Sequence, residues 1–514
     1  MIQDWKDITS TPDLNWVPCF DNFTCTILQV PLDYTDLSIG NTTVPFIKFS
    51  STNASAEDVL FNPGGPGASG IIAVKNGYKT ILSVIGSRNN LVGFDPRGVN
   101  NSGLSLECFP NNLGAKIDFI IETLNRPIDD SSEAAIYDTY LKEMGWGERC
   151  TAHQDPKQPK QYANTVAVAN DMRYYSELRA KSLGLPVETS KLWYYGTSYG
   201  TILGETYATL FPDRIGRMLL DGVVDSEEWY SGSFLGSLVH ADAGMKTFFA
   251  DCFAAGPAHC SFSGNSTSAD DIERRFYTLF EQIQKRPLLA DVALTATPVT
   301  VTWREIKYVF FEALYDPSLS FAGLADTLAD LEQGNGTSLA MLSSQADLQL
   351  AYNNSQVVYA DVLALSEIGC IDAAGRHNVS AFEDYLDYVH EQVNISWIGG
   401  GQWAVATAGA CTRLDIKPPQ SQLFQGTSGS NHTSVPILFL SNTLDPVAPI
   451  ESARKESSRF AGSTVLTLNG TAHCGLQNPS VCQHQHTQKY MLDATLPPAG
   501  TVCGRTAIPF GSTT

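Results

Sequence analysis

Short apolar segments bounded by glycine, proline, asparagine and aspartate fill the first hundred residues, and they predict β-strands. We expect these strands at residues 24–30, 44–50, 58–62 and 90–95. Apolar positions at helical spacing then predict a helix over about 164–182, a buried strand at 191–195, a helix that runs to Leu210, and a strand at 217–224. Strands that alternate with helices predict an α/β fold with a mostly parallel central sheet covered on both faces.

This alternation stops at about residue 225, and helical patterns dominate as far as residue 431. The helices expected there span 272–285, 303–315, 321–333, 359–368 and 381–393. Strands at 435–440 and 464–468 and a helix at 483–492 restore the earlier rhythm. We therefore predict one α/β core built from residues 1–224 and 432–514, with residues 225–431 inserted as a large, mainly helical lid.

A serine with small neighbours stands between a predicted strand and a predicted helix, in Gly196-Thr197-Ser198-Tyr199-Gly200. The pattern G-x-S-x-G in this position is typical of a nucleophile on a tight turn, whose hydroxyl projects above the sheet. An ordinary glycine-rich turn is the alternative. Ser198 is the predicted nucleophile.

A serine nucleophile needs a base that takes its proton and a carboxylate that orients the base. In strand–turn–helix sites the acid and then the histidine follow the serine along the chain. Asp445 ends a predicted strand, and His473 follows the next strand. We predict Ser198, Asp445 and His473 as a catalytic triad and assign His484 and His486, near the last helix, to the surface.

A glycine-rich segment, Asn62-Pro63-Gly64-Gly65-Pro66-Gly67, follows the predicted strand at 58–62. Repeated glycine lets backbone N–H groups approach a substrate oxygen without a Cβ in the way. We predict that the N–H groups of Gly65 and Tyr199 bind the oxyanion, with Gly64 as the fallback for Gly65. A plain turn is the alternative.

These motifs occur in order with several others along the chain. The others are Cys25 with Val30-Pro31-Leu32-Asp33-Tyr34, Gly93-Phe94-Asp95-Pro96-Arg97-Gly98, Phe211-Pro212, Asp221-Gly222-Val223-Val224-Asp225, Asp445-Pro446, and the stretch from His473 to Cys503. On these residues the chain resembles the tripeptidyl-aminopeptidase-like branch of the proline iminopeptidase family, which has the α/β-hydrolase fold. The resemblance implies a Ser-His-Asp peptidase that removes short N-terminal pieces from peptides.

An aminopeptidase must bind the free ammonium group of its substrate, which requires a desolvated carboxylate near the site. The candidates are Glu227, Glu228, Glu367 and Asp372. We select Glu228 and Glu367, and a structural role is the alternative for each.

The composition of the chain excludes some classes of partner and cofactor. The chain has 514 residues, 43% of them hydrophobic, which is enough for a large packed core. A net charge of −21 argues against nucleic acid and anionic membranes as main partners, and no apolar run has the length of a membrane helix.

Because we find no dinucleotide fingerprint and no metal-ligand cluster, we expect no cofactor and no metal. We expect a peptide or small acyl substrate and favour a monomer.

Glycosylation acceptors of the form Asn-x-Ser/Thr are more frequent than the roughly four expected by chance, and such sites belong to secreted proteins. They begin at Asn22, Asn41, Asn53, Asn100, Asn265, Asn335, Asn353, Asn378, Asn394, Asn431 and Asn469. The first residues lack the basic and apolar regions of a signal peptide, so we expect a leader that is absent from this chain. We predict a secreted glycoprotein.

The 11 cysteines form no C-x-x-C motif, and the odd number leaves one thiol over. Pairing neighbours along the sequence gives Cys19–Cys25, Cys108–Cys150, Cys252–Cys260 and Cys370–Cys411. Three cysteines remain, Cys474, Cys482 and Cys503. Proximity favours Cys474–Cys482, whereas the family resemblance favours Cys482–Cys503 with Cys474 free.

Three functions are consistent with these observations. The first is a secreted serine aminopeptidase that works through an acyl-enzyme. The second is a carboxylesterase, or a biosynthetic acyl hydrolase or transferase, with the same triad. The third is a non-catalytic binding module, which the presence of the serine, the histidine and the glycine-rich loop disfavours.

Overall fold

Ten strands form one sheet in the computed structural model, which describes every residue except 125, 291–297, 344–361, 378, 507 and 512–514. In spatial order they are β1 (Val17–Cys19), β2 (Phe23–Pro31), β3 (Asn41–Phe49), β5 (Asn90–Phe94), β4 (Asp58–Asn62), β6 (Leu192–Thr197), β7 (Ile215–Asp221), β10 (Leu438–Leu444), β11 (Thr464–Thr471) and β12 (Val502–Gly504). Pairings from β1 to β5 are antiparallel, and those from β5 to β12 are parallel. The predicted α/β fold with a mostly parallel sheet is confirmed.

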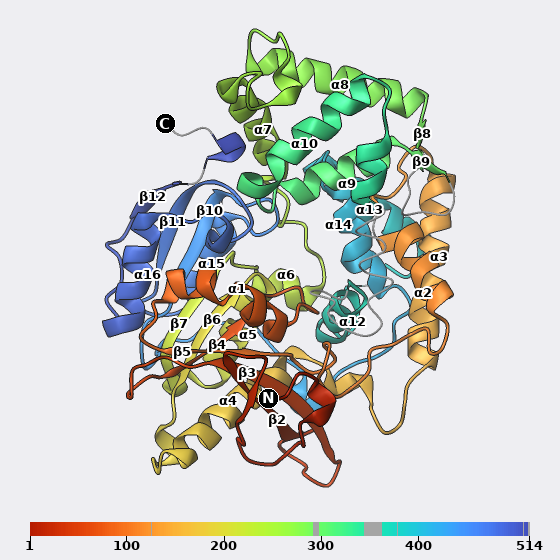
Figure 1. Ribbon diagram of the computed structural model, residues 1–514. Helices are drawn as coiled ribbons and strands as arrows, with labels where there is room; N and C mark the ends of the chain where they lie inside the picture. The colour runs from red at the N-terminus through yellow and green to blue at the C-terminus, as the bar shows by residue number, and fades with distance from the viewer. Residues whose placement is uncertain (125, 291–297, 344–361, 378, 507, 512–514) are drawn as a thin grey trace.

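Helices cover both faces of this sheet (Figure 1). One face packs against α1 (Gly70–Ile85) and α16 (Val481–Asp493), and the other against α4 (Thr165–Ser182), α5 (Tyr199–Leu210) and α15 (Ile450–Arg459). All five residues of β4 are buried, as expected for a parallel strand covered on both sides.

Helix α1 is an element that the sequence analysis missed. It starts three residues after the glycine-rich segment, with glycine at its first position, and it is capped by Ser69, whose side chain accepts a hydrogen bond from Ile72 N–H. Its first residue must be small, because a Cβ at Gly70 would lie 2.4 Å from the carbonyl oxygen of Phe94. The close approach of α1 to β5 brings the glycine-rich segment over the edge of the sheet.

A helical region is inserted between β7 and β10, as predicted. Its helices are α6 (Ser226–Ser231), α7 (Ala241–Ala255), α8 (Ala269–Lys285), α9 (Trp303–Ala313), α10 (Pro317–Glu332), α12 (Val362–Ala373), α13 (Phe382–Ile395) and α14 (Gly400–Ala406), with a ribbon of β8 (Leu288–Ala290) and β9 (Val299–Val301). Residues 359–361 of the predicted helix at 359–368 lie outside the described residues. The boundaries at 224/225 and 431/432 stay a prediction.

Two apolar clusters divide the inserted helices. Helices α7 to α10 form one cluster, while α12, α13 and α14 share the other with α3 (Glu133–Ala152), which comes before β6 in the chain. In Figure 1 these two groups lie above and beside the carboxyl ends of the parallel strands. The lid therefore covers the edge of the sheet where active sites of α/β folds form.

Five disulfides and one free thiol account for the cysteines. The bonds are Cys19–Cys25, Cys108–Cys150, Cys252–Cys260, Cys370–Cys411 and Cys482–Cys503. Cys474 is free and buried, so the last pair follows the family resemblance and not the shortest loop. Five disulfides indicate an extracellular protein.

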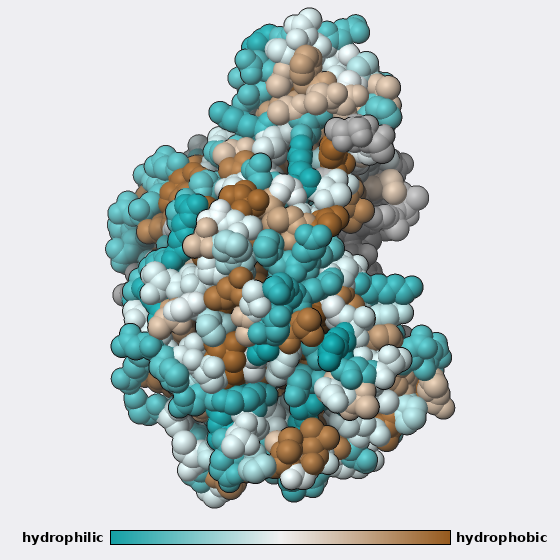
Figure 2. Space-filling view, turned by 90° about the vertical axis from the view of Figure 1, so that its left-hand side faces the viewer, coloured by the Kyte–Doolittle hydropathy of each residue, from teal (hydrophilic) through white to brown (hydrophobic). Residues whose placement is uncertain are grey.

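The surface carries polar and apolar residues side by side on the face shown in Figure 2. Such mixing is usual for a face in contact with water. Among the described residues, no helix is long and apolar enough to cross a bilayer.

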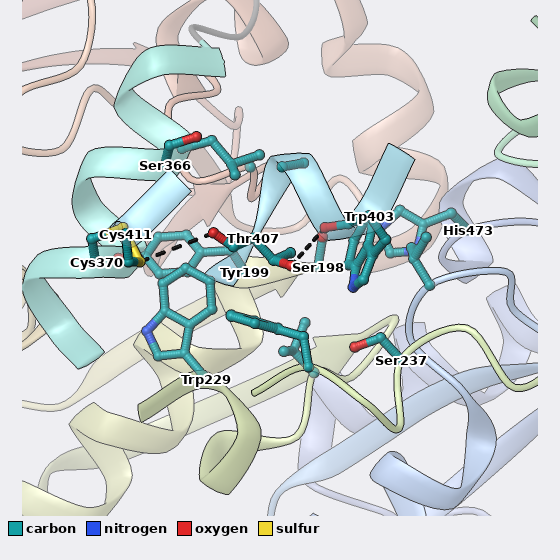
Figure 3. A pocket seen from close by; sticks show the side chains of 17 residues that line it. Ser198, Tyr199, Trp229, Ser237, Ser366, Cys370, Trp403, Thr407, Cys411 and His473 are labelled. Atoms are coloured by element: carbon teal, nitrogen blue, oxygen red, sulfur yellow. Dashed lines mark hydrogen bonds between the residues drawn. A yellow bond between two sulfur atoms is a disulfide. The ribbon is translucent and has the colours of Figure 1, made fainter. Parts of the chain in front are cut away.

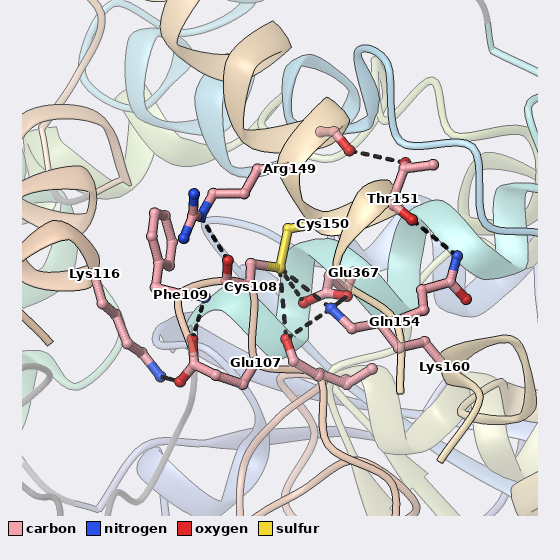
Figure 4. Close-up of a disulfide and its surroundings, with 12 residues drawn as sticks. Glu107, Cys108, Phe109, Lys116, Arg149, Cys150, Thr151, Gln154, Lys160 and Glu367 are labelled. Carbon is pink, nitrogen blue, oxygen red and sulfur yellow. Dashed lines mark hydrogen bonds and ion pairs between the residues drawn. A yellow bond between two sulfur atoms is a disulfide. The ribbon is translucent and has the colours of Figure 1, made fainter. Parts of the chain in front are cut away.

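A buried ion pair anchors α12 beside the Cys108–Cys150 disulfide (Figure 4). Lys160 Nζ lies 2.9 Å from Glu367 Oε2, and both side chains are almost fully shielded from solvent. Lys160 also donates to the carbonyl oxygen of Leu106. The pair ties the lid helix to the chain segment that leads into α4.

Replacing Lys160 by methionine should therefore leave a buried carboxylate without its cation. We expect Lys160→Met to lower the free energy of unfolding by about 3–5 kcal/mol, and Lys160→Met with Glu367→Met to recover much of that loss because both charges are gone. Urea denaturation followed by tryptophan fluorescence measures both. The matched control is Lys142→Met, which breaks the exposed pair with Asp138 and should change stability by less than about 1 kcal/mol. A loss for Lys160→Met no larger than that of the control would contradict the anchoring role.

Candidate active site

Ser198 occupies the sharp turn between β6 and α5. It is the N-cap of α5 and has φ 56° and ψ −128°. A residue other than glycine adopts a positive φ rarely, at a cost of about 1–3 kcal/mol that the surroundings must offset. Ser198 N–H donates to the carbonyl oxygen of Asp221 over 2.9 Å, which holds the turn against β7. This is the strand–turn–helix geometry of a nucleophile elbow.

Three glycines allow the backbone to close around this serine. A Cβ at Gly196 would lie 2.3 Å from the carbonyl oxygen of Gly200, and a Cβ at Gly200 would lie 2.7 Å from that of Asn62. A Cβ at Gly64 would lie 2.7 Å from Ser198 Cβ. The glycine-rich loop after β4 thus packs directly on the serine turn.

His473 and Asp445 form a buried pair at the ends of β10 and β11. His473 Nδ1 lies 3.0 Å from Asp445 Oδ1 and 3.2 Å from Oδ2. The carboxylate also accepts hydrogen bonds from the backbone N–H groups of Val447, Ala448 and Cys474. Because an ionised carboxylate only accepts hydrogen bonds, it favours the proton on Nδ1 and leaves the lone pair on Nε2.

Asp221 joins the serine turn to the histidine loop. Its carbonyl oxygen accepts the Ser198 N–H, and its carboxylate accepts hydrogen bonds from Gly475 N–H at 2.6 Å and Leu476 N–H at 3.2 Å. The hydroxyl of Tyr195 on β6 donates to the same carboxylate over 2.9 Å. Burial raises the pKa of Asp221 to about 6, opposed by these hydrogen bonds. The sequence analysis gave Asp221 no role, although a charged residue at the end of a buried apolar strand is a recognisable signal.

The N–H groups of Gly64 and Gly65 in the glycine-rich loop differ in their partners. Gly64 N–H already donates to Asn62 Oδ1 over 2.9 Å. Gly65, in contrast, lines the same pockets as Ser198 and has no hydrogen-bond partner for its N–H among the described residues. Tyr199, at the first turn of α5, also lines the pocket beside Ser198. Gly65 therefore fits the predicted position better than its fallback, Gly64.

Two pockets meet at Ser198. The inner pocket has a volume of about 70 Å³ and is walled by apolar side chains (Figure 3). The outer pocket has a volume of about 580 Å³ and is more polar. The residues that line both pockets are Gly65, Ser198, Leu365, Trp403, Val447 and His473. A bound substrate at Ser198 can therefore extend in two directions.

The chain is similar to several known hydrolases along most of its length. Residues 398–503 match the family model described as TAP-like protein. The serine protease Hip1 of Mycobacterium tuberculosis is 27% identical over 506 residues, covering 95% of this chain and 91% of the relative. The tripeptidyl aminopeptidase of Streptomyces lividans is 24% identical over 518 residues, covering 98% and 87%. Carboxylesterase B of Mycobacterium tuberculosis is 25% identical over 488 residues, covering 93% and 86%.

The chain therefore resembles TAP-like hydrolases along nearly its whole length. These relatives confirm the predicted resemblance and indicate a serine hydrolase. Their names include both peptidases and an esterase, so they leave the substrate class open.

The carboxylates selected for ammonium binding lie away from both pockets. Glu367 is paired with Lys160 behind α12. Glu228 accepts hydrogen bonds from Gly236 N–H and the Ser237 hydroxyl, and burial raises its pKa. Neither lines a pocket that contains Ser198. Both carboxylates hold the lid together, so their selection as substrate ligands has no support in this geometry.

The remaining candidates are also engaged elsewhere. Glu227 pairs with Lys455 and Arg459, and Asp372 accepts hydrogen bonds from Thr165 and Trp229. His484 and His486 lie on α16, outside the linings of both pockets.

The lid also contacts His473 directly. The carbonyl oxygen of Tyr315, just after α9, accepts the His473 N–H over 2.9 Å, and the two rings meet edge to face with centroids 5.1 Å apart. One turn earlier, Glu312 has a solvent-exposed side chain, but the protein atoms around it raise its pKa to about 7, while the charge of His473 acts to lower it. Glu312 is therefore a second titratable group close to His473.

Removing this charge should move the pH dependence of the reaction. Because the pKa of Glu312 is about 7 and its charge interacts with His473, Glu312→Gln should shift the limb of the kcat/KM profile near pH 7. The rate of p-nitrophenyl acetate hydrolysis between pH 5 and 9 measures the limb. Glu391→Gln, at an exposed carboxylate on α13, is the matched control and should leave it in place. An unshifted limb in Glu312→Gln would disprove the coupling.

Proposed function

We propose that this protein is an extracellular aminopeptidase in which Ser198, His473 and Asp445 form the catalytic triad. Ser198 attacks the carbonyl carbon while His473 Nε2 takes its proton, and Asp445 orients the imidazole. His473 then protonates the leaving amine, and a water molecule activated by His473 releases the acyl group. The observation that carries this proposal is that Ser198 and His473 line the same two pockets while Asp445 holds the far side of the imidazole.

The oxyanion is bound in this mechanism by the N–H groups of Gly65 and Tyr199. Both residues line the pocket at Ser198, and both N–H groups belong to rigid elements, the loop after β4 and the first turn of α5. Preorganised donors of this kind each contribute on the order of 10²–10³ in rate. Tyr199 also sits at a helix N-terminus, where the partial positive charge favours an anion.

A peptidase that requires a free N-terminus needs a carboxylate within the pockets, and Asp316 is the one that supports this proposal. It is the sole carboxylate among the described residues that line the two pockets. Burial raises the pKa of Asp316, because its charge is poorly solvated there. Pairing with a substrate ammonium would relieve that cost.

The extracellular part of the proposal has two supports. Five disulfides are stable only in an oxidising compartment. Among the nine glycosylation acceptors that are described, Asn53 is partly buried and the others are exposed, namely Asn22, Asn41, Asn100, Asn265, Asn335, Asn394, Asn431 and Asn469. Asn353 and Asn378 lie outside the described residues. We therefore propose a secreted glycoprotein.

Substrate comparison tests the proposed activity. We expect a fluorophosphonate probe to label the wild-type enzyme but not Ser198→Ala, and tripeptidyl aminomethylcoumarin to be cleaved faster than its N-acetylated form. Equal cleavage of the free and blocked peptides would exclude an aminopeptidase. Turnover of simple esters with neither peptide cleaved would instead favour the carboxylesterase that one relative's name suggests.

Asp316 can be tested without disturbing its helix. Asp316 caps α10 through a hydrogen bond from Leu319 N–H, and asparagine caps helices as well as aspartate does. Asp316→Asn should therefore keep the fold and lower kcat/KM about tenfold for the free peptide, with the acetylated peptide unchanged. Asp4→Asn is the control, since Asp4 caps the short helix η1 (Trp5–Asp7) through a hydrogen bond from Lys6 N–H and lies outside both pockets. Equal losses on both peptides would show that Asp316 acts on the fold and not on the ammonium.

A further inference from the structure

The inner pocket is a partly enclosed, mainly apolar recess beside Ser198. Its lining includes Trp229, Phe234 and residues of α12, and Trp403 lines both this recess and the outer pocket (Figure 3). Its volume is about 70 Å³, against about 580 Å³ for the outer pocket, so it is by far the smaller of the two. The recess therefore has the form of a specificity pocket for a single substrate group.

The chemistry of the walls selects an uncharged group. Within the described lining, His473 is the only side chain that can carry a charge near neutral pH, since burial raises the pKa of the Tyr199 phenol and Cys370 and Cys411 are joined in a disulfide. Asp372 is not part of this lining, and its carboxylate accepts a hydrogen bond from Trp229 Nε1 over 3.0 Å. An ammonium group that entered would lose its hydration without a carboxylate in the lining to pair with.

Gly369, on α12, is one of the residues that line this recess. A Cβ built there would lie 3.6 Å from Trp229 Cη2 and 4.0 Å from Cζ2, which is ordinary van der Waals contact. The residue is helical and has no positive φ, so a side chain would strain neither the backbone nor the nearest atoms. The glycine is therefore not required by the fold, and its effect is to leave space against Trp229.

Helix α12, which carries Gly369, is held in place by two interactions. The disulfide Cys370–Cys411 ties α12 to the segment after α14, and the pair Lys160–Glu367 ties it to the core. Because α12 is fixed at both places, a methyl group added to it at Gly369 would occupy space that a substrate atom needs. The pocket should therefore discriminate between substrates by size.

We propose that the inner pocket binds the apolar side chain of the residue whose carbonyl is attacked, aromatic or branched aliphatic, and that Gly369 sets its depth. This inference rests on the proposed acyl transfer at Ser198 but not on the preference for a free N-terminus. Gly369 is a specificity residue in this scheme, and a larger side chain there should exclude large acyl groups while sparing small ones.

Two p-nitrophenyl esters with one leaving group test the depth of the pocket. Their acyl groups are acetyl and 3-phenylpropanoyl, and kcat/KM is measured for wild type, Gly369→Ala and Gly369→Val. We expect Gly369→Val to lower kcat/KM for the phenylpropanoyl ester at least about tenfold while the acetate stays within about twofold, with Gly369→Ala in between. Gly323→Val on α10 is the matched control, because a Cβ there meets no atom within 4 Å.

The outcomes separate this inference from the proposed function. A parallel loss on both esters, or an unchanged preference in both variants, would overturn the role of Gly369. If Gly369→Val does not fold, Gly369→Ala decides, since alanine is a better helix former than glycine and should still reduce the preference for the larger ester. A wild-type enzyme that hydrolyses neither ester and binds no fluorophosphonate would overturn acyl transfer at Ser198 itself.

Discussion

The hydrogen bonds made by Asp221 are the constraint on which the site depends. Its backbone carbonyl fixes the strained turn at Ser198, and its carboxylate fixes Gly475 and Leu476 in the loop just after His473. Ser198 and His473 are about 275 residues apart in the chain, and the whole lid lies between them. A group that contacts both of their loops must therefore fix the distance between the two side chains. One buried aspartate at the end of β7, between β6 and β10, does this.

The burial of Asp221 holds its hydrogen bonds in place and also raises its pKa. Asp221 is fully buried and close to Asp445, and the pKa of Asp221 rises to about 6 because burial outweighs its hydrogen bonds. Since its folded-state pKa is raised above the usual value for aspartate, this carboxyl lowers the stability of the fold progressively as pH rises from about 4 to about 6, and the penalty stays constant at higher pH. The hydrogen bonds from three neighbours offset part of that cost, and they act only while the loops stay in position.

The core and its chemistry were predictable because both follow from local patterns. Strands with period-two or continuous apolar runs predicted the sheet. The order Ser198, Asp445, His473 placed three groups just after β6, β10 and β11, and a parallel sheet brings such strand ends to one edge. The roles of Glu228 and Glu367 were not predictable. Their partners, Gly236 and Ser237 for one and Lys160 for the other, depend on how lid helices pack, and Lys160 lies 207 residues before Glu367 in the chain. Helix α1 was missed because glycines at its start mask its periodicity.

The strands and the lid contribute different parts of this site. The turn at Ser198, the loop at Gly64 and the pair Asp445–His473 are set by backbone geometry that tolerates almost no side-chain change. The walls of the inner pocket, in contrast, come from α6, α12 and α14, where Gly369 and Trp229 can be exchanged without disturbing a strand. Substrate choice can therefore change in this architecture by one residue on a lid helix while the reaction stays the same. The disulfide and the buried ion pair that fix α12 keep such a change local, because they prevent the helix from adjusting around the new side chain.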